Sequence, residues 1–343
     1  MNMSTTKIML EKIKSINPKR LNLLAERIAE ENNKSVSFVK KDMIKNFLKY
    51  KIGYTDYFKG NYINLTKEEK KNYVTSKNYI SVLAYLNPKQ YRVITLNKLV
   101  FNNLFKDYLK REYLDVRRST EEDIKKFLKN KESVFAKPIT DFGGHGISKI
   151  NVKEITDVQK FKQELLNKKQ YLLEEGLKQH KVLNEINPDC FASFRIITIY
   201  HNGEVFTFDH VIRIGLDADP ALACFDGDMR INEDGTPASG MWDDNGTLYD
   251  KHPLTGYEIK KLKKIPYVPE AIAMAKEAAT LVPELRYIGW DIAITETGPA
   301  IIEGNECPSY GPTQNYMLNP NNKGHLKEIR DIIGEEEFKK IKL

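Results

Sequence analysis

Cysteine is scarce in this chain of 343 residues. Its three cysteines, Cys190, Cys224 and Cys307, lie far apart, and no C-x-x-C pair occurs. This pattern indicates neither a disulfide framework nor a zinc site. A reducing cytoplasm is therefore the location that we expect.

Long apolar runs are also missing. The first residues, MNMSTTKIMLEKIKS, alternate apolar and polar side chains, and no stretch reaches the roughly 20 apolar residues of a membrane span. We expect no signal peptide and no integral membrane segment.

Several signatures of chemistry are absent as well. The chain lacks H-E-x-x-H, G-x-S-x-G, a Walker A loop and G-x-G-x-x-G, so metalloprotease, serine-hydrolase and dinucleotide-binding interpretations have no support. No basic-aromatic module for nucleic acid occurs. The net charge of +7 suits an anionic ligand such as a nucleotide, or an anionic membrane surface, although a solvated lysine-rich surface explains it more simply.

The pattern of apolar residues divides the chain into three regions. Residues 1–90 show helical spacing; a break is expected at Asn17-Pro18, and a capping box at Thr66–Glu69 opens a helix to about Leu86. Residues 91–176 mix helices with short strands, including an antiparallel hairpin. Residues 177–343 carry strands at about 194–200 and 205–214, a long Gly- and Asp-rich loop, and a terminal helix. The fold class that we predict is α+β.

A β-hairpin over residues 287–305 is the clearest local feature. Two strands flank a turn at Glu296-Thr297-Gly298, and pairing centred on Thr297 places Asp291 opposite Glu303. Two facing carboxylates repel, and a cation would relieve the repulsion. Asn305 points to the same face, so the three side chains form an oxygen set suited to Mg²⁺. The opposite face is expected to pack in the core, through Trp290, Ile292, Ile294 and Ile302. The alternative is an edge hairpin whose acids face water.

A second candidate lies at FAKPITDFGGHGISKI, residues 135–150. Lys137 ends an apolar strand and precedes a glycine-rich hairpin loop that also contains His145. Glycines allow backbone N–H groups to approach a phosphate, and lysine adds a charge. An ordinary glycine-containing hairpin is the alternative.

Further charged residues lie in or at the ends of strands. Glu174 and Glu175 end an apolar strand, where they could meet an adenine or ribose, or simply face water. Arg195 and Arg213 interrupt apolar strands, and arginine is costly to bury alone. Each could bind a phosphate or a substrate carboxylate, or pair with Asp291 or Glu303.

Taken in chain order, these features are the lysine strand, the glycine-rich hairpin, the strand that ends in two glutamates, the two arginine strands and the acidic hairpin. They resemble the ATP-grasp superfamily and, more narrowly, its sugar-transfer-associated family. The resemblance covers roughly residues 90–318 and is carried by LLEEGLKQHKVLNEINPDCFASFRIITIY, VIRIG and YIGWDIAITETGPAIIEGN. It departs from the family pattern at 192–194 and 224–230. The implied fold is two α+β subdomains, 91–176 and 177–343, that grip ATP behind a helical region, 1–90.

The resemblance implies a role for each candidate. Lys137 would contact the α- and β-phosphates, and Arg195 and Arg213 the γ-phosphate or an acyl-phosphate. Mg²⁺, with Mn²⁺ as an alternative, would be held by Asp291, Glu303 and Asn305. The residues expected around the nucleotide are Gly143, Gly144, His145, Gly146, Glu174, Glu175, Leu177, Gln179 and His180.

The implied activity is an ATP-grasp ligase that joins a carboxylate to an amine or thiol through an acyl-phosphate. The expected setting is surface polysaccharide biosynthesis, with small or glycan-linked acceptors, a cytoplasmic location and a homodimer as one option. Two alternatives stay open: a kinase on the same scaffold, and a nucleotide-binding scaffold without catalysis.

Overall fold

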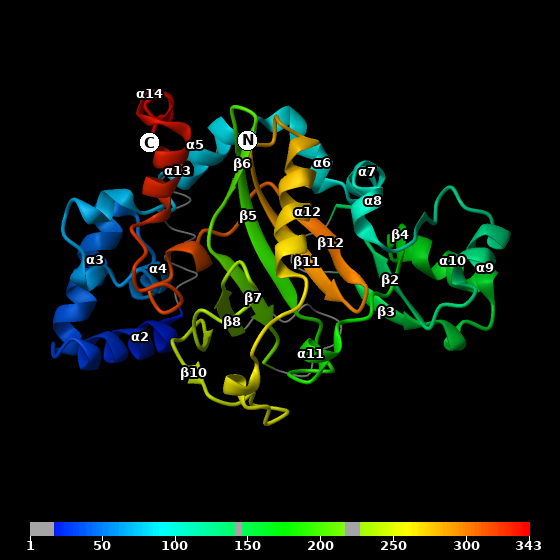
Figure 1. The fold of residues 1–343 in the computed structure, drawn as a ribbon, viewed down its shortest axis with the longest axis horizontal. Helices are drawn as coiled ribbons and strands as arrows, with labels where there is room; N and C mark the ends of the chain where they lie inside the picture. The colour runs from blue at the N-terminus through cyan, green and yellow to red at the C-terminus, as the bar shows by residue number, and fades with distance from the viewer. Residues whose placement is uncertain (1–16, 141–145, 217–226) are drawn as a thin grey trace.

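The computed structural model describes residues 17–140, 146–216 and 227–343. Two antiparallel sheets organise this part of the chain. The small sheet has four strands in the order β1-β4-β2-β3; the large sheet has the order β10-β9-β8-β7-β5-β11-β12, with β6 beside β5. Figure 1 shows the small sheet at one end of the molecule, the N-terminal helices at the other end, and the large sheet between them. The fold is an α+β arrangement behind a helical region, as the sequence predicted.

The helices and strands have the following bounds. The helices are α2 Pro18–Glu31, α3 Val36–Tyr50, α4 Tyr54–Lys59, α5 Tyr79–Leu86, α6 Val93–Leu96, α7 Lys98–Leu104, α8 Lys106–Leu109, α9 Glu121–Leu128, α10 Val158–Asn167, α11 Lys181–Asn184, α12 Val268–Thr280, α13 His325–Ile333 and α14 Glu335–Phe338. The strands are β1 Tyr113–Asp115, β2 Ser133–Lys137, β3 Ser148–Asn151, β4 Leu172–Glu175, β5 Ser193–His201, β6 Glu204–Thr207, β7 His210–Ile214, β8 Gly227–Ile231, β9 Met241–Asp243, β10 Leu248–Tyr249, β11 Tyr287–Thr295 and β12 Gly298–Asn305.

The N-terminal helices have a core of their own. The side chain of Asn17 caps α2, with Pro18 at the first helical position, and Ser35 caps α3. The helices bury a cluster that includes Leu24, Val39 and several tyrosines. This region therefore does not depend on the large sheet alone for its apolar packing.

The helix predicted from the Thr66–Glu69 box to Leu86 is wrong in its extent. The reciprocal bonds between Thr66 and Glu69 form, but they start only a 3₁₀ turn. The chain then leaves helical geometry because Gln314 bonds both the N–H and the carbonyl of Val74. Helix α5 begins afresh at Tyr79.

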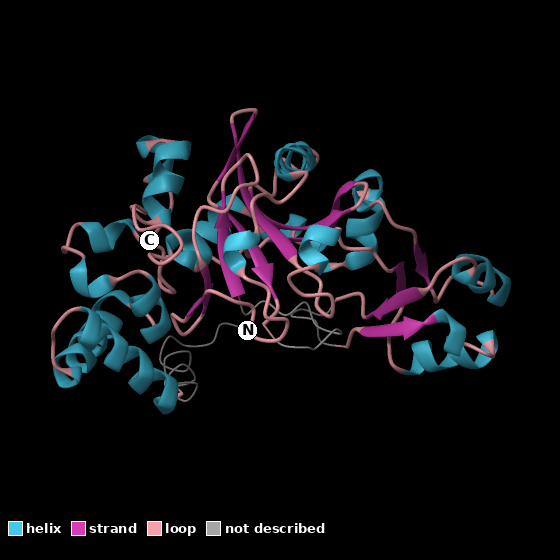
Figure 2. Cartoon of the chain, turned by 60° about the horizontal axis from the view of Figure 1, so that its bottom comes forward, coloured by secondary structure: helices cyan, strands magenta, loops and turns pink. Residues whose placement is uncertain are grey.

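The small sheet contains the antiparallel hairpin that the sequence predicted, formed by β2 and β3. Helices α9 and α10 pack on it around Val134, Ala136, Phe161 and Leu173. Figure 2 shows this sheet and its two helices standing apart from the large sheet.

One face of the large sheet is covered by α12, which runs across it in Figure 1. Trp290, Ile292 and Ile294 of β11 lie in this core, as predicted. Helices α7 and α8 also pack here, through Phe101 and Phe105 against the Trp290 ring.

The other face of the large sheet is apolar at one end of its strands and charged farther along. At one end Ile197, Ile199 and Tyr287 pack against α5 and α13. Every second residue of a strand points to the same face of the sheet. Farther along the same two strands, this face therefore carries Arg195 of β5 and Asp291 of β11. The charged part of this face forms the candidate site.

The β11–β12 hairpin pairs Asp291 with Glu303, as predicted, but its turn and its register differ from the prediction. The turn has two residues, because Thr295 already pairs with Gly298. A register shift next to Ile292 then inserts one extra residue in β12 and restores the predicted pairing. Ile301, not the predicted Ile302, therefore occupies the core face.

The strand predicted over residues 205–214 is broken into β6 and β7. Both segments pair with β5, but their registers differ by one residue. In the region expected to be a loop, the described residues form β8, β9 and β10, which extend the sheet.

Candidate functional site

Residues from the two sheets line one narrow cavity of about 40 Å³. Lys137, at the end of β2, contributes from the small sheet, and Glu303 and Asn305 of β12 contribute from the large sheet. Lys98 of α7 and Glu174 of β4 complete its polar lining. The fold thus brings together the predicted phosphate-binding lysine and two of the predicted metal ligands.

Glu174 is a buried counter-ion rather than an exposed strand end. Its Oε2 accepts from Lys137 Nζ at 2.5 Å, and its Oε1 accepts from Arg111 at 3.0 Å and from Asn102 at 2.7 Å. Burial alone would raise the pKa of Glu174, but the charges of Arg111 and Lys137 outweigh it and hold that pKa well below its usual range. Glu174 therefore fixes the position of Lys137.

Asp291 is gripped by Arg195 from the neighbouring strand. Arg195 Nε and one terminal nitrogen donate to the two carboxylate oxygens at 2.6 and 2.7 Å, and Ser193 Oγ donates at 3.2 Å. Burial opposes ionisation of Asp291, but the Arg195 charge prevails and lowers its pKa. The salt bridge that the sequence left as an alternative for Arg195 is formed.

Glu303 lies opposite Asp291 with no such compensation. Burial first, and then the charge of Asp291, raise the pKa of Glu303. The charges of Lys137 and Lys98 act in the other direction and are smaller in effect. This is the repulsion between facing carboxylates expected from the hairpin.

The types of ligand atom at this position suit a magnesium ion. Asp291, Glu303 and Asn305 offer oxygens from one face, the ligands that Mg²⁺ prefers. Asn305 turns its Nδ2 group toward Asp291 and Glu303, at 3.2 and 3.4 Å. Rotation of this amide would present its oxygen instead. Among the described residues, no three His, Cys, Asp or Glu side chains gather into a metal-binding group, so the amide oxygen is needed as the third ligand.

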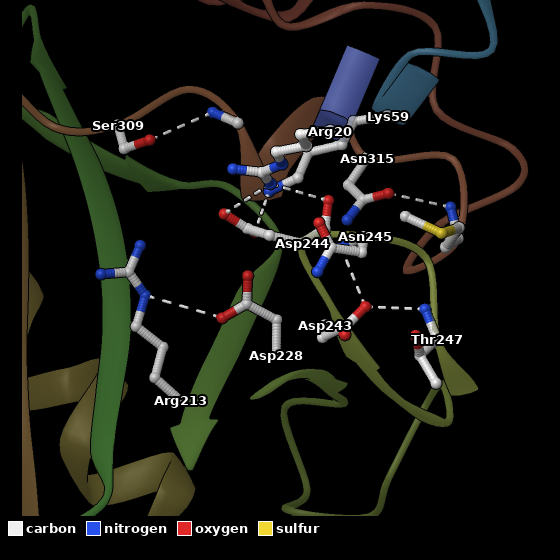
Figure 3. Close-up of polar contacts among 12 residues, drawn as sticks. Arg20, Lys59, Arg213, Asp228, Asp243, Asp244, Asn245, Thr247, Ser309 and Asn315 are labelled. Carbon is white, nitrogen blue, oxygen red and sulfur yellow. Dashed lines mark hydrogen bonds and ion pairs between the residues drawn. The ribbon is translucent and has the colours of Figure 1, made fainter. Parts of the chain in front are cut away.

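Arg213 lies on the same sheet face, two strands from Asp291. Its guanidinium is 3.8 Å from Asp228 Oδ1, across a directly paired position of β7 and β8. Figure 3 shows the Asp228 carboxyl group pointing toward Arg213 and Asp244. Within the described residues, Asp228 Oδ1 is buried and accepts no hydrogen bond, and burial raises the pKa of this carboxyl. A buried acceptor of this kind is costly unless a ligand satisfies it.

The N-terminal helices reach this part of the site. Lys59, at the end of α4, pairs with Asp244, and Arg20 of α2 donates to the Asp244 carbonyl at 3.0 Å (Figure 3). The Lys59 charge acts on Asp228, lowering its pKa against the effect of burial. The helical region therefore borders the side of the site that holds Arg213.

The predicted residues after β4 have mainly structural contacts. Gln179 accepts from Ala192 N–H and donates to Asn184, and His180 caps α11 through its Nδ1. Neither residue lines the cavity. Glu175 accepts from the Glu112 N–H at 3.2 Å, and Leu177 is half-buried in the connecting segment.

The glycine loop is described only at its end. Gly146 has a φ of +72°, and its carbonyl accepts from Gln170 at 2.7 Å. Gly143, Gly144 and His145 lie outside the described residues.

Sequence reasoning missed Lys98, Asn102, Arg111 and Asp228. No motif surrounds the first three, and each reaches the site from a distant part of the chain. Asp228 follows the pair Asp226-Gly227 in a region without strand periodicity, and only its pairing with Arg213 identifies it.

A larger open depression of about 880 Å³ lies between β6, β8 and α13. None of the predicted site residues lines it. Across the described ranges, no helix combines the length and apolar character that a membrane crossing requires.

The solved structures to which this chain is similar include synthetases and ligases. They include an ADP complex of N5-carboxyaminoimidazole ribonucleotide synthetase (14% identity, TM-score 0.39, 64% of this chain and 46% of that one). D-alanyl-alanine synthetase A from Vibrio cholerae O1 biovar eltor matches with 13% identity and a TM-score of 0.43, over 72% of this chain and 65% of that one. D-Alanine-D-alanine ligase from Helicobacter pylori matches with 11% identity and a TM-score of 0.40, over 74% and 62%.

These likenesses concern the fold alone, and the chain spans only 46% to 65% of the length of these three proteins. No protein with a curated description matches the chain. The sequence model of one family, sugar-transfer associated ATP-grasp, matches residues 75–329. That match includes both sheets and every residue of the candidate site outside the N-terminal helices, and the chain therefore belongs to the sugar-transfer associated ATP-grasp family.

Proposed function

We propose that this protein is an ATP- and Mg²⁺-dependent ligase that joins a carboxylate to an amine or thiol through an acyl-phosphate, in the synthesis of a surface polysaccharide or its precursor. The observation that carries the proposal is the shared cavity, where Lys137 of one sheet faces Glu303 and Asn305 of the other. A phosphate chain with its metal ion needs cations on one side and oxygen ligands on the other.

Each side chain has a defined task in this proposal. Lys137 and Lys98 bind the phosphates, and Glu174 holds Lys137 in place. Arg195 orients Asp291, leaving its remaining guanidinium nitrogen to face a ligand. Mg²⁺, when bound by Asp291, Glu303 and Asn305, would neutralise charge on the transferred phosphoryl group. No protein nucleophile is required, which agrees with the missing nucleophile motifs.

The cavity is far smaller than the several hundred Å³ that a nucleotide fills. Nucleotide binding therefore requires the two sheets to separate at this point. Such opening would have to break the contacts of Arg111, which joins Glu174 of the small sheet to the carbonyls of Ile301 and Ile302 in β12.

The acceptor is assigned to the region of Arg213 and Asp228. An ammonium group there would supply the hydrogen bonds that Asp228 Oδ1 lacks. Arg213, 3.8 Å away, would steady the acyl-phosphate that the amine attacks. Asp228 would take one proton from the ammonium group, which makes the amine nucleophilic, and the departing phosphate would take the second proton as the amide bond forms.

The test is the identity of the products. Purified protein is incubated with Mg·ATP and a panel of carboxylates and amines, and products are analysed by mass. We expect ADP, phosphate and a product with the mass of both substrates minus water. A persistent phosphorylated product formed without an amine would identify a kinase. Absence of turnover, with nucleotide still bound, would favour the scaffold alternative.

A further inference from the structure

Helix α3 exposes three large apolar side chains on its outer face. Phe38, Ile44 and Leu48 are 51%, 59% and 57% exposed, although the helix buries Val39 and Met43 on its inner face. Figure 1 shows α3 at the end of the molecule farthest from α9 and α10. Exposed apolar residues grouped on one element of a soluble domain indicate an interaction surface.

Lysines alternate with these apolar residues on the same face. Lys41, Lys45 and Lys49 follow each other at four-residue steps and are all exposed. At 3.6 residues per turn, Lys41 and Lys45 fall within the arc that Phe38, Ile44 and Leu48 occupy, and Lys49 lies about 20° beyond Phe38. The outer face of α3 is therefore both apolar and basic.

Among the described residues, no ion pair joins Lys41, Lys45 or Lys49 to a carboxylate. Asp42, the acidic residue of α3, turns inward, where it accepts from Tyr57 Oη at 2.6 Å and from Asn46 Nδ2 at 2.9 Å. The inner position of Asp42 leaves the lysine charges uncompensated at the surface.

This combination selects among possible partners. A second copy packed on the same face would bring lysines against lysines, which is unfavourable. A soluble anion would bind the lysines but would leave the apolar side chains exposed to water. An anionic bilayer suits both sets, because the apolar side chains enter the boundary of the hydrocarbon while lysine stems extend to lipid phosphates.

We propose that the outer face of α3, defined by Phe38, Lys41, Ile44, Lys45, Leu48 and Lys49, docks the protein onto the surface of an anionic lipid bilayer. The helix lies in the plane of the headgroups and does not cross the membrane. Docking itself does not depend on the catalytic assignment.

The position of α3 has a consequence that does rest on the proposed function. Helix α4 follows α3 directly, and Lys59 at its end pairs with Asp244 beside Arg213 and Asp228. A membrane-docked α3 would hold the acceptor side of the site near the bilayer, where a lipid-linked glycan precursor is available.

Vesicle sedimentation with the full chain tests the docking. We expect the protein to bind vesicles of equimolar phosphatidylcholine and phosphatidylglycerol, to bind weakly to phosphatidylcholine alone, and to dissociate as salt rises. The triple variant Lys41→Gln, Lys45→Gln, Lys49→Gln should bind on the order of a hundredfold more weakly, since each lysine contributes a factor of about five. The variant Phe38→Ser, Ile44→Ser, Leu48→Ser should lose binding even at low salt.

A matched control changes three exposed lysines in and directly after α9, at the other end of the molecule, to glutamine: Lys125, Lys126 and Lys129. This control should bind as the unchanged protein does. Because all substituted side chains are exposed, thermal unfolding of each variant should be unaltered. Equal binding by the α3 lysine variant and the α9 control would overturn the proposal. A second result would also overturn it: the unchanged protein does not bind vesicles but forms a dimer, seen by light scattering, and the apolar variant does not form that dimer.

Discussion

Arg195 and Asp291 face each other across neighbouring strands, and the guanidinium donates to both oxygens of the carboxylate. Both side chains are buried. Asp291 therefore has a structural partner in addition to its candidate role as a metal ligand. This double role changes which substitutions can test the site.

Replacing Asp291 with asparagine should destabilise the fold as well as remove activity. The substitution leaves the buried Arg195 without an anion, which costs about 3–5 kcal/mol. Chemical denaturation would measure the loss. The double change Arg195→Met with Asp291→Leu should recover most of that stability and remain inactive. An Asp291→Asn variant as stable as the original would show that the pair contributes little.

Glu303→Gln separates metal binding from folding. Because burial and Asp291 raise the pKa of Glu303, its ionisation opposes folding at neutral pH. In metal-free buffer the variant should melt higher than the original, by about 2 °C. Mg·ATP should stabilise the original protein but not the variant. If Mg·ATP stabilises both equally, Glu303 is not a metal ligand.

Glu174→Gln should produce a pH-dependent loss of stability. The pKa of Glu174 is lowered in the folded protein, so its contribution is fully present above the unfolded value of about 4.3 and is lost as pH falls through the lower folded value. We expect a loss of about 3–5 kcal/mol at pH 7, because Arg111 and Lys137 lose their counter-ion.

Urea titrations at a series of pH values would follow this loss, and the two proteins should converge in acid. The exposed Glu112, which pairs with Lys131, supplies a matched control: Glu112→Gln should change stability by no more than about 0.5 kcal/mol. A pH-independent difference between Glu174→Gln and the original would contradict the assignment of Glu174 as a charged counter-ion.

Lys137→Met should weaken ATP binding without unfolding the protein. Arg111 still compensates Glu174 in this variant, so we expect folding to persist while the dissociation constant for ATP rises about tenfold or more. Calorimetric titration would measure it. Lys178→Met, which removes an exposed lysine paired with Glu132, should bind ATP normally. Equal affinity of the two variants would remove Lys137 from the nucleotide site.

Asp228→Asn should impair the amine-dependent step alone. The acyl-phosphate should still form and be trapped by hydroxylamine, which is an uncharged nucleophile at neutral pH. Amide formation with a protonated amine should fall by about a hundredfold, in line with loss of a general base. Asp250→Asn, on the exposed side chain of another aspartate, is the control. Loss of hydroxamate formation as well would place Asp228 in the phosphoryl-transfer step instead.

Local sequence predicted the hairpin and its most important pairing. Alternation of side chains along β11 placed Asp291 on the face opposite Trp290, and the turn residues set its partner close to Glu303. The length of the turn and the irregularity in β12 were not predictable, because two compensating one-residue shifts leave the pairing of Asp291 unchanged.

The contacts between charged side chains could not be predicted from the local sequence pattern. For Glu174 the sequence left open a ligand contact or an exposed strand end. Only the approach of Asn102 from α7 and of Arg111 from the segment before β1 made it a buried counter-ion. The Thr66–Glu69 box formed as predicted, but Gln314, some 240 residues later, ended the helix that should follow. Sequence periodicity carries no information about such distant partners.

The sequence by itself determined the fold class, the family, the strand that ends at Lys137 and the hairpin that carries Asp291 and Glu303. The strand and the hairpin follow from steric and apolar preferences acting over a few residues, whereas the family follows from the resemblance of several motifs taken in chain order. Only the tertiary structure decided that Arg195 pairs with Asp291, that Glu174 fixes Lys137, and that Asp228 lies buried beside Arg213. A buried charge is stable only with a partner within a few ångströms, and chain folding alone brings such partners together.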